Sequence, residues 1–402
     1  MKKRVVLLGA YGIESAGDDA PLLVLTERLR RAHPEVSFEF TVIARHPDPL
    51  IESLAGVRFL PNLEHESREA ARGRWFHGLN PGDDTEHLGA VSREIQEADL
   101  VVAGAGNFLV DLTIDVLRGP VPLFATYAFL CDLHRTPFLL YGISAGPLAT
   151  SYGRQLSSWM VRRSAAVTCR DDASVALLRE LDPEARPLRL PDPVLGLRPA
   201  GDEEVAALFA EEGIDAETER PRLALALRDV SFLDFDRNVL VEALRELAAD
   251  YELLFVPQCT YADGDDREEA ERIARALPDA TIHHVRGRHA PSTLMRVYET
   301  ADATIAMRLH GAVFSALAGV PPVGIAYLPK VASFLEEFGL GELSVSLAGA
   351  TPEGLVERVR RSRHVDAGQL VEQCRSAALG VDGYVTLASR LLRLTPASDA
   401  AA

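Results

Sequence analysis

The sequence has few cysteines and no long hydrophobic run, and each absence excludes a class of protein. The four cysteines are widely separated, with no CxxC pair and no spacing typical of a metal site: Cys131, Cys169, Cys259 and Cys374. Three of them lie in apolar surroundings, which favours buried thiols in a reducing compartment. No apolar run is long enough to span a bilayer as a helix. We therefore expect neither a disulfide scaffold nor a membrane-spanning protein.

The N-terminus resembles a signal peptide only superficially. MKKRVVLLGAYG has a basic start and a short apolar stretch, but it lacks an A-x-A-like site and is soon followed by Gly17, Asp18 and Asp19. A first β-strand explains this stretch better. The sequence thus predicts a cytoplasmic protein.

The charge balance limits the possible partners. The formal net charge is −17, with 47% apolar and 25% charged residues, a globular composition. The overall field should repel nucleic acid and anionic membrane surfaces. An anionic ligand must therefore be held by a local group of arginines.

Apolar strands alternate with amphipathic helices almost throughout the chain. In the first half we expect strands at 4–9, 38–45, 100–104, 137–143 and 165–170, and helices at 18–34, 86–98, 121–135, 154–164 and 171–181. The pattern weakens between residues 196 and 220, and then a fresh strand begins at 223 and the alternation repeats. Strands that are apolar on both faces predict parallel sheets wrapped by helices.

These features predict an α/β protein with two doubly wound, Rossmann-like domains facing each other across a cleft. The predicted domains are residues 1–200, with an insertion at about 62–90, and residues 220–380. A C-terminal helix and a disordered tail make up residues 381–402. Ligands of such sheets bind beyond the carboxyl ends of the strands.

Two glycine-containing segments follow predicted strands. Gly17 and Asp18 precede the first helix, while Gly106 and Asn107, with Gly104 and Asp111 nearby, follow the strand at 100–104. Either segment would suit a ligand, but a tight strand-to-helix turn explains such glycines equally well.

Arg170 and Arg308 are stronger candidates, because each ends an apolar strand directly before a helix, where backbone N–H groups favour an anion. For Arg170 the alternative is a salt bridge to Asp171 or Asp172, although these neighbours face it poorly. For Arg308 the alternative is a buried bridge to an acidic residue elsewhere in the chain.

The stretch MRLHG adds His310 and Gly311 to this site. His310 is either a core or capping histidine, or, beside Arg308, a hydrogen-bond donor to phosphate or a proton carrier. If "RLH" ends the strand, residues 308 and 310 point to the same side and share one anion. Gly311 would then allow a tight turn into a helix whose amides add to the site.

Five segments together resemble the polysaccharide pyruvyl transferase family: "YGIESAGDDA", "GAGNFLVD", "YGISAGPL", "CRDDAS" and "RLHGAVFSALAGVPPVGIAYLPK". Their order and spacing cover residues 8 to 340. The resemblance implies a fold like that of GT-B glycosyltransferases. It also implies transfer of pyruvate from phosphoenolpyruvate to a sugar, forming a ketal across two hydroxyls, with Arg170, Arg308 and His310 holding phosphoenolpyruvate.

The residues suit this chemistry. Phosphoenolpyruvate carries about three negative charges, which arginines grip in a bidentate manner. No step requires a metal or a redox cofactor, so we expect His310 and Asp18 to supply the acid and base. Lys330 either reaches the same anion or ends a turn. The insertion at 62–90 is expected to help select a sugar, glycolipid or glycan acceptor.

Two other functions remain open. A nucleotide-sugar glycosyltransferase has a turn similar to "HGAVFSALAGVP", but usually a glutamate on that helix holds the ribose, and no acidic residue lies between Gly311 and Gly319. The second alternative function is that of a non-catalytic sugar-binding protein.

The acidic run at 262–272 resembles a metal loop, but Asp265 and Asp266 more simply cap a helix. The basic helix with Arg154, Trp159, Arg162 and Arg163 either contacts a lipid-linked acceptor or is a solvated face.

Overall fold

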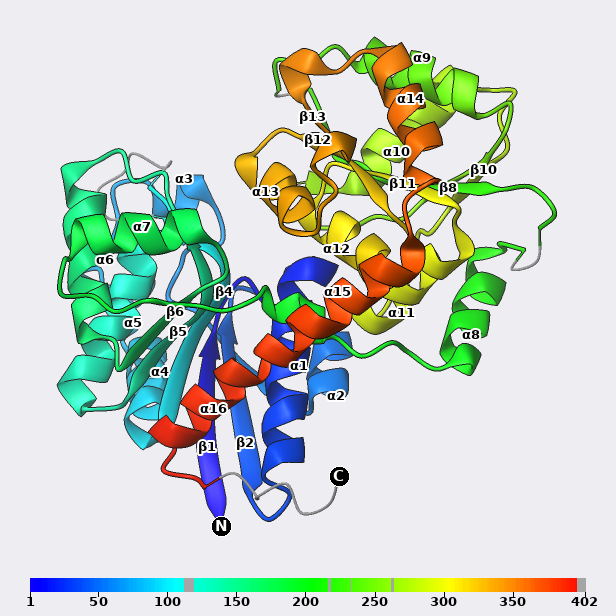
Figure 1. The fold of residues 1–402 in the computed structure, drawn as a ribbon. Helices are drawn as coiled ribbons and strands as arrows, with labels where there is room; N and C mark the ends of the chain where they lie inside the picture. The colour runs from blue at the N-terminus through cyan, green and yellow to red at the C-terminus, as the bar shows by residue number, and fades with distance from the viewer. Residues whose placement is uncertain (112–118, 216–217, 232, 262–263, 396–402) are drawn as a thin grey trace. The chain divides into compact units, whose positions relative to one another are not determined.

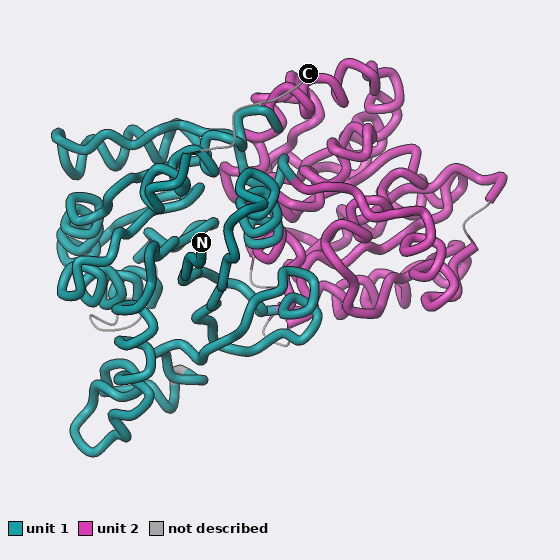
Figure 2. The backbone as a smooth tube through the Cα atoms, turned by 90° about the horizontal axis from the view of Figure 1, so that it is seen from below, with its two compact units in different colours: residues 1–13, 21–196, 378–402 teal, residues 14–20, 197–377 magenta. Residues whose placement is uncertain are grey.

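The structure of the chain is a computed structural model that describes residues 1–111, 119–215, 218–231, 233–261 and 264–395. It divides into two compact units (Figures 1 and 2). Unit 1 comprises residues 1–13, 21–196 and 378–402, and unit 2 comprises residues 14–20 and 197–377. The predicted disordered tail is largely at residues 396–402, which lie outside the described residues.

Unit 1 is built on a seven-stranded parallel sheet in the order β3-β2-β1-β4-β5-β6-β7. The strands are β1 (Lys2–Leu8), β2 (Ser37–Ala44), β3 (Arg58–Pro61), β4 (Leu100–Leu109), β5 (Phe138–Ala145), β6 (Ala166–Cys169) and β7 (Leu188–Arg189). The helices are α1 (Ala16–Ala32), α2 (Pro49–Ala55), α3 (Arg68–Ala71), α4 (Glu86–Glu97), α5 (Pro120–His134), α6 (Ser151–Arg163), α7 (Asp172–Leu181) and α16 (Asp382–Leu391). The first turn of α1 is assigned to unit 2.

Unit 2 is built on a six-stranded parallel sheet in the order β10-β9-β8-β11-β12-β13. The strands are β8 (Arg222–Ala226), β9 (Glu252–Phe255), β10 (Ile282–His284), β11 (Ala303–Ala306), β12 (Pro322–Ala326) and β13 (Ser344–Ser346). The helices are α8 (Asp202–Glu212), α9 (Arg237–Leu247), α10 (Asp266–Ala276), α11 (Pro291–Val297), α12 (Leu309–Leu317), α13 (Pro329–Glu337), α14 (Pro352–Ser362) and α15 (Ala367–Gly380).

The central strands of both sheets are buried on both faces, as their continuous apolar sequences predict. Leu7, Leu8, Val101 and Val102 are fully buried in unit 1, and unit 2 has its own core around Leu223 and Leu225 on β8. Each sheet is doubly wound, so the predicted α/β class with two Rossmann-like domains is confirmed.

Three features of the chain path were not anticipated. The strand predicted to end at residue 104 continues as β4 to Leu109. Residues 14–20 belong to unit 2, and residues 378–402 to unit 1. In the predicted insertion at 62–90, Leu63 and Phe76 pack into the core of unit 1, while Trp75 is exposed.

In each sheet the strand order reverses beside its first strand, between β1 and β4 and between β8 and β11. The carboxyl ends of these strands are the usual ligand positions of a doubly wound sheet. In the described parts of the chain, no helix has both the length and the apolar character needed to cross a bilayer.

Candidate functional site

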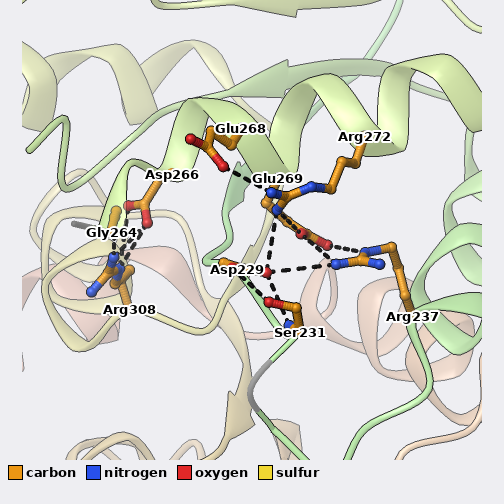
Figure 3. Close-up of polar contacts among 9 residues, drawn as sticks. All are labelled: Asp229, Ser231, Arg237, Gly264, Asp266, Glu268, Glu269, Arg272 and Arg308. Carbon is orange, nitrogen blue, oxygen red and sulfur yellow. Dashed lines mark hydrogen bonds and ion pairs between the residues drawn. The ribbon is translucent and has the colours of Figure 1, made fainter. Parts of the chain in front are cut away.

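Arg308 lies in unit 2 at the reversal point between β8 and β11. It follows β11 by two residues and is the N-cap residue of α12. Its Nε and Nη2 donate to the Asp266 carboxylate, with an Nη2–Oδ1 distance of 2.5 Å, and Nη2 also donates to the Gly264 carbonyl at 3.1 Å (Figure 3). The buried bridge considered from the sequence is therefore present. Nη1 makes no hydrogen bond to the part of the chain that the structure describes.

Asp266 fixes this guanidinium from the first residue of α10. Its carboxylate is buried and also accepts the backbone N–H groups of Gln258 and Cys259, each at 3.0 Å. Burial opposes the charged form of Arg308, but attraction to Asp266 outweighs it and raises the pKa of Arg308. Asp265, not Asp266, caps α10, so the capping role predicted for Asp266 is wrong.

Residues 14–20 bring the start of the chain to the same edge of unit 2. Ser15 pairs with Cys259 as an isolated bridge, and the Ala16 N–H donates to the Gln258 carbonyl at 2.9 Å. The buried carboxylate of Asp19 accepts from Arg288 at 2.6 Å. These contacts hold the first turn of α1 at the end of β9.

Gly17 and His310 are in direct contact in this arrangement. A Cβ atom on Gly17 would lie 1.8 Å from His310 Nδ1, so only glycine leaves room for the imidazole. His310 lies in the first turn of α12 rather than on β11, so the expectation that residues 308 and 310 point together along a strand is wrong. The helix start places the ring against residues 14–20 instead.

Asp18 follows Gly17, and its carboxylate accepts a hydrogen bond from the Ser15 hydroxyl at 2.5 Å. Ser15 pairs with Cys259, whose backbone N–H donates to Asp266, the partner of Arg308. Burial raises the pKa of Cys259, and the charges of Asp266 and Asp18 add to that rise while Arg308 opposes it.

Arg228 is a cation at this edge that was not identified from the sequence. It follows β8, whose Ala226 pairs with Ala306 of β11, so Arg228 and Arg308 stand at the same level of adjacent strands. Its guanidinium lies 4.8 Å from the centre of the Tyr327 ring, after β12. The contact joins the two strands that flank β11. The sequence pattern that marked the other two arginines was present here too. The apolar run "LALALR" ends in Arg228, just as two other apolar runs end in Arg170 and Arg308.

Gly311 and Lys330 also lie at this edge. Gly311 is helical and buried, and a Cβ there would lie 2.3 Å from the Ala226 Cβ. Close packing of α12 on β8, not a tight turn, explains this glycine. Lys330 is in the first turn of α13 and is half-buried.

A second ion-pair network lies further along α10 (Figure 3). Arg237 donates twice to the buried Glu269, at 2.7 and 3.0 Å, and Asp229 lies 3.2 Å from Arg272. This network ties the segment after β8, and thus the backbone next to Arg228, to α10. A cavity of about 290 Å³ beside it is lined by α10, including Asp266, and by the ends of β8, β9 and β10.

Arg170 lies in unit 1 between β6 and α7, as predicted. It is buried and donates to Asp192 at 2.9 Å and to the Ser144 hydroxyl at 2.8 Å. Asp171 instead caps α7 and accepts from Ser144. A salt bridge exists, but its partner is neither of the adjacent aspartates.

The predicted loop with Gly106 and Asn107 is part of β4. Asn107 is exposed there, while Gly104 approaches β5 so closely that a Cβ would lie 1.9 Å from the Tyr141 carbonyl oxygen. Asp111 is buried and accepts the Ala149 and Thr150 N–H groups at 2.6 and 2.7 Å. The close approach of β4 to β5 explains why residue 104 is a glycine. Asp111 has a structural role, because it holds the backbone at the start of α6.

The basic side chains of α6 are paired. Arg154 bonds Glu180, Arg162 lies 3.0 Å from Asp182, and Arg163 bonds Asp132. Within the described ranges, no three histidine, cysteine or acidic side chains are arranged to hold a metal ion.

The sequence matches the polysaccharide pyruvyl transferase family over residues 16–329, and the chain belongs to that family. The family places it among transferases that act on polysaccharides. The suspected resemblance is confirmed.

Solved structures share the fold at low sequence identity. The Neisseria meningitidis UDP-GlcNAc 2-epimerase bound to UDP-GlcNAc is 11% identical, with a TM-score of 0.59 over 98% of this chain and 100% of that one. Anabaena HepE in complex with UDP-glucose is 12% identical, with a TM-score of 0.60 over 97% and 98%. A Rickettsia africae glycosyltransferase is 12% identical, with a TM-score of 0.59 over 98% and 96%. The similarity shows a GT-B-like fold.

Proposed function

We propose that the protein transfers the pyruvate moiety of phosphoenolpyruvate to two hydroxyls of a sugar or glycan acceptor, releasing phosphate. The observation that carries this proposal is the contact between the first turn of α1 and His310. This turn carries Asp18, and it is connected to the Arg308–Asp266 pair through Ser15 and the backbone of Cys259.

The cations at this edge suit a small, highly charged substrate. Asp266 presets Arg308 and leaves Nη1 for the substrate, so less side-chain entropy is lost on binding. Arg228 adds a second guanidinium, and the first amides of α12, including that of Gly311, favour an anion. His310, Lys330 and the closely packed Gly17 complete the proposed subsite. For Arg170 of unit 1, a role in binding phosphoenolpyruvate rests on the family resemblance alone.

The reaction needs only proton transfers. An acid protonates the methylene carbon of phosphoenolpyruvate, and one acceptor hydroxyl attacks C2 and loses its proton to a base. The C2–O bond to phosphate then breaks, the second hydroxyl attacks C2, and its proton leaves with phosphate. We assign the acid and base to His310 and Asp18, and general acid–base catalysis by such groups contributes about 10²–10⁴-fold.

Unit 1 is the proposed acceptor side. Asn107 is exposed near the carboxyl end of β4, and Gly106 lies beside it. The 62–90 segment, with exposed Trp75, offers a surface for a sugar. A cytoplasmic location, where phosphoenolpyruvate is available, is part of this proposal.

The test is incubation with phosphoenolpyruvate and a panel of sugar, glycan and glycolipid acceptors, followed by mass spectrometry and phosphate release. We expect one acceptor to gain a pyruvate ketal with one phosphate released. In parallel, phosphoenolpyruvate should raise the melting temperature and uridine diphosphate should not. Stabilisation by uridine diphosphate alone, with no ketal, would favour the glycosyltransferase alternative.

A further inference from the structure

A basic pocket lies at the amino-terminal edge of the unit 1 sheet, the edge opposite the strand ends considered above. Its volume is about 470 Å³, and it lies where β5 begins and where α5, α6 and α16 end. Four arginines and one aspartate supply its charges: Arg135, Arg163, Arg390, Arg393 and Asp132. On a chain of net charge −17, this is a concentrated positive patch.

Most of these arginines have no acidic side-chain partner among the residues that the structure describes. Arg163 pairs with Asp132, but Arg135, Arg390 and Arg393 form no side-chain ion pair or hydrogen bond with the residues that the structure describes. Three helix C-termini, each worth about half a negative charge, offset about one and a half charges. Helix-dipole compensation thus accounts for only part of the cluster.

Two of these arginines occupy positions that favour glycine. Arg135 ends α5 at φ 59° and Arg393 follows α16 at φ 56°, both in the left-handed region. Glycine would end either helix at lower conformational cost. Arginine at both positions therefore adds positive charge to the pocket at a conformational cost.

Two exposed apolar side chains lie near the carboxyl end of α5, the helix that ends at the pocket. Leu133, next to Asp132, is 62% exposed, and Phe129, one turn earlier, is 55% exposed. Large apolar groups beside arginines are typical of surfaces that lie at a membrane interface, where rings and aliphatic chains enter the headgroup region.

We propose that this surface, formed by Phe129, Leu133, Arg135, Arg390 and Arg393, docks the protein on an anionic phospholipid membrane. The overall negative charge does not prevent this contact, because charges more than about 8 Å from the surface are largely screened at physiological salt. A second copy of the chain fits less well, because a two-fold contact would place these arginines against one another. The inference stands on unit 1 alone and does not depend on the proposed reaction.

The test is co-sedimentation of the full chain with phosphatidylcholine vesicles, with and without phosphatidylglycerol. We expect binding only to the anionic vesicles. Arg390→Gln with Arg393→Gln should weaken it about 25-fold, since each basic residue near a charged membrane contributes about 5-fold. Phe129→Ser with Leu133→Ser should also weaken it. Arg360→Gln with Arg375→Gln, exposed arginines of unit 2, is the matched control.

Each result decides the proposal. Equal sedimentation with both kinds of vesicle, or wild-type binding by both double variants, would overturn it. Analytical ultracentrifugation tests the alternative that this surface contacts a second copy of the chain. A dimer that is lost in the arginine double variant, together with no vesicle binding, would support that alternative and overturn the membrane proposal. If the arginine double variant does not fold, the apolar pair and Arg390→Gln alone carry the test.

Discussion

The carboxyl-terminal edges of the two sheets share a topology but differ in charge. In unit 2, Arg228 and Arg308 follow adjacent strands, and His310 and Lys330 begin the next helices. In unit 1, Arg170 is paired with Asp192 as Arg308 is with Asp266, but Asp111 there is an acid that backbone amides satisfy. The difference shows that strand order supplies a position for a ligand, while the residues after the strands decide its charge. Unit 2 is therefore the proposed phosphoenolpyruvate side.

His310→Gln should give the largest effect. If the imidazole handles a proton, phosphoenolpyruvate binding stays near normal and turnover falls about 10²–10⁴-fold, because glutamine donates hydrogen bonds but does not titrate. If it only holds phosphate, binding and turnover fall together. Calorimetric titration and steady-state kinetics separate these outcomes, with the exposed His364→Gln as control. Full turnover would make His310 structural.

Replacing the strand-ending arginines compares the two edges directly. Arg308→Lys should weaken phosphoenolpyruvate binding by about 1.5–3 kcal/mol, since lysine does not keep the fork on Asp266 and still reach the substrate. We expect the same for Arg170→Lys by the family resemblance, along with a stability loss because Arg170 is the more buried. Calorimetry with urea unfolding measures both. Wild-type affinity in a folded variant would remove that arginine from the site.

Gly17→Ala tests how residues 14–20 cooperate with unit 2. The new methyl group would collide with His310, so the ring must move, and a misplacement of about 1 Å is enough to cost about 100-fold in turnover. Gly201→Ala, where the nearest atom is 3.7 Å away, is the control. Unchanged kinetics in Gly17→Ala would show that the contact does not matter for catalysis.

Asp111→Asn tests how much the hydrogen-bonded carboxylate of Asp111 stabilises unit 1. Burial opposes its ionisation, but hydrogen bonds from Thr150 and Ala149 outweigh this and lower the pKa of Asp111. Its stabilisation is therefore complete above the unfolded pKa of about 3.9 and is lost as the pH falls through the folded value. At pH 7 the variant should be less stable by about 1–3 kcal/mol.

Urea unfolding in an acid series provides the measurement, with exposed Asp250→Asn as control. The difference between wild type and Asp111→Asn should shrink below about pH 4. A difference that is independent of pH would assign the effect to packing rather than to the carboxylate.

Removal of metal ions is expected to have no effect on turnover. The proposed steps are proton transfers, so turnover should survive exhaustive dialysis against a chelator. Activity that is lost and then restored by magnesium or manganese would contradict this, and would strengthen the glycosyltransferase alternative.

The sequence by itself determined the fold class, the family, and the positions of Arg170 and Arg308 within two residues of a strand end. It did so because strands buried on both faces require continuous apolar runs, so a charge where a run ends stands out. The start of α12 was misplaced by two residues, since the apolar "MRLHGAVF" suits either strand or helix.

Only the tertiary structure decided which acidic side chains pair with these arginines. Asp266 is 42 residues from Arg308, and Asp192 is 22 from Arg170, so no local pattern links them. The assignment of residues 14–20 to unit 2 rests on backbone bonds to residues 258–260, which composition and periodicity do not encode. The basic pocket of unit 1 likewise depends on the meeting of three helix ends. Long-range pairing is a property of the packed chain, and that is why the chemistry of both edges had to be read from the fold.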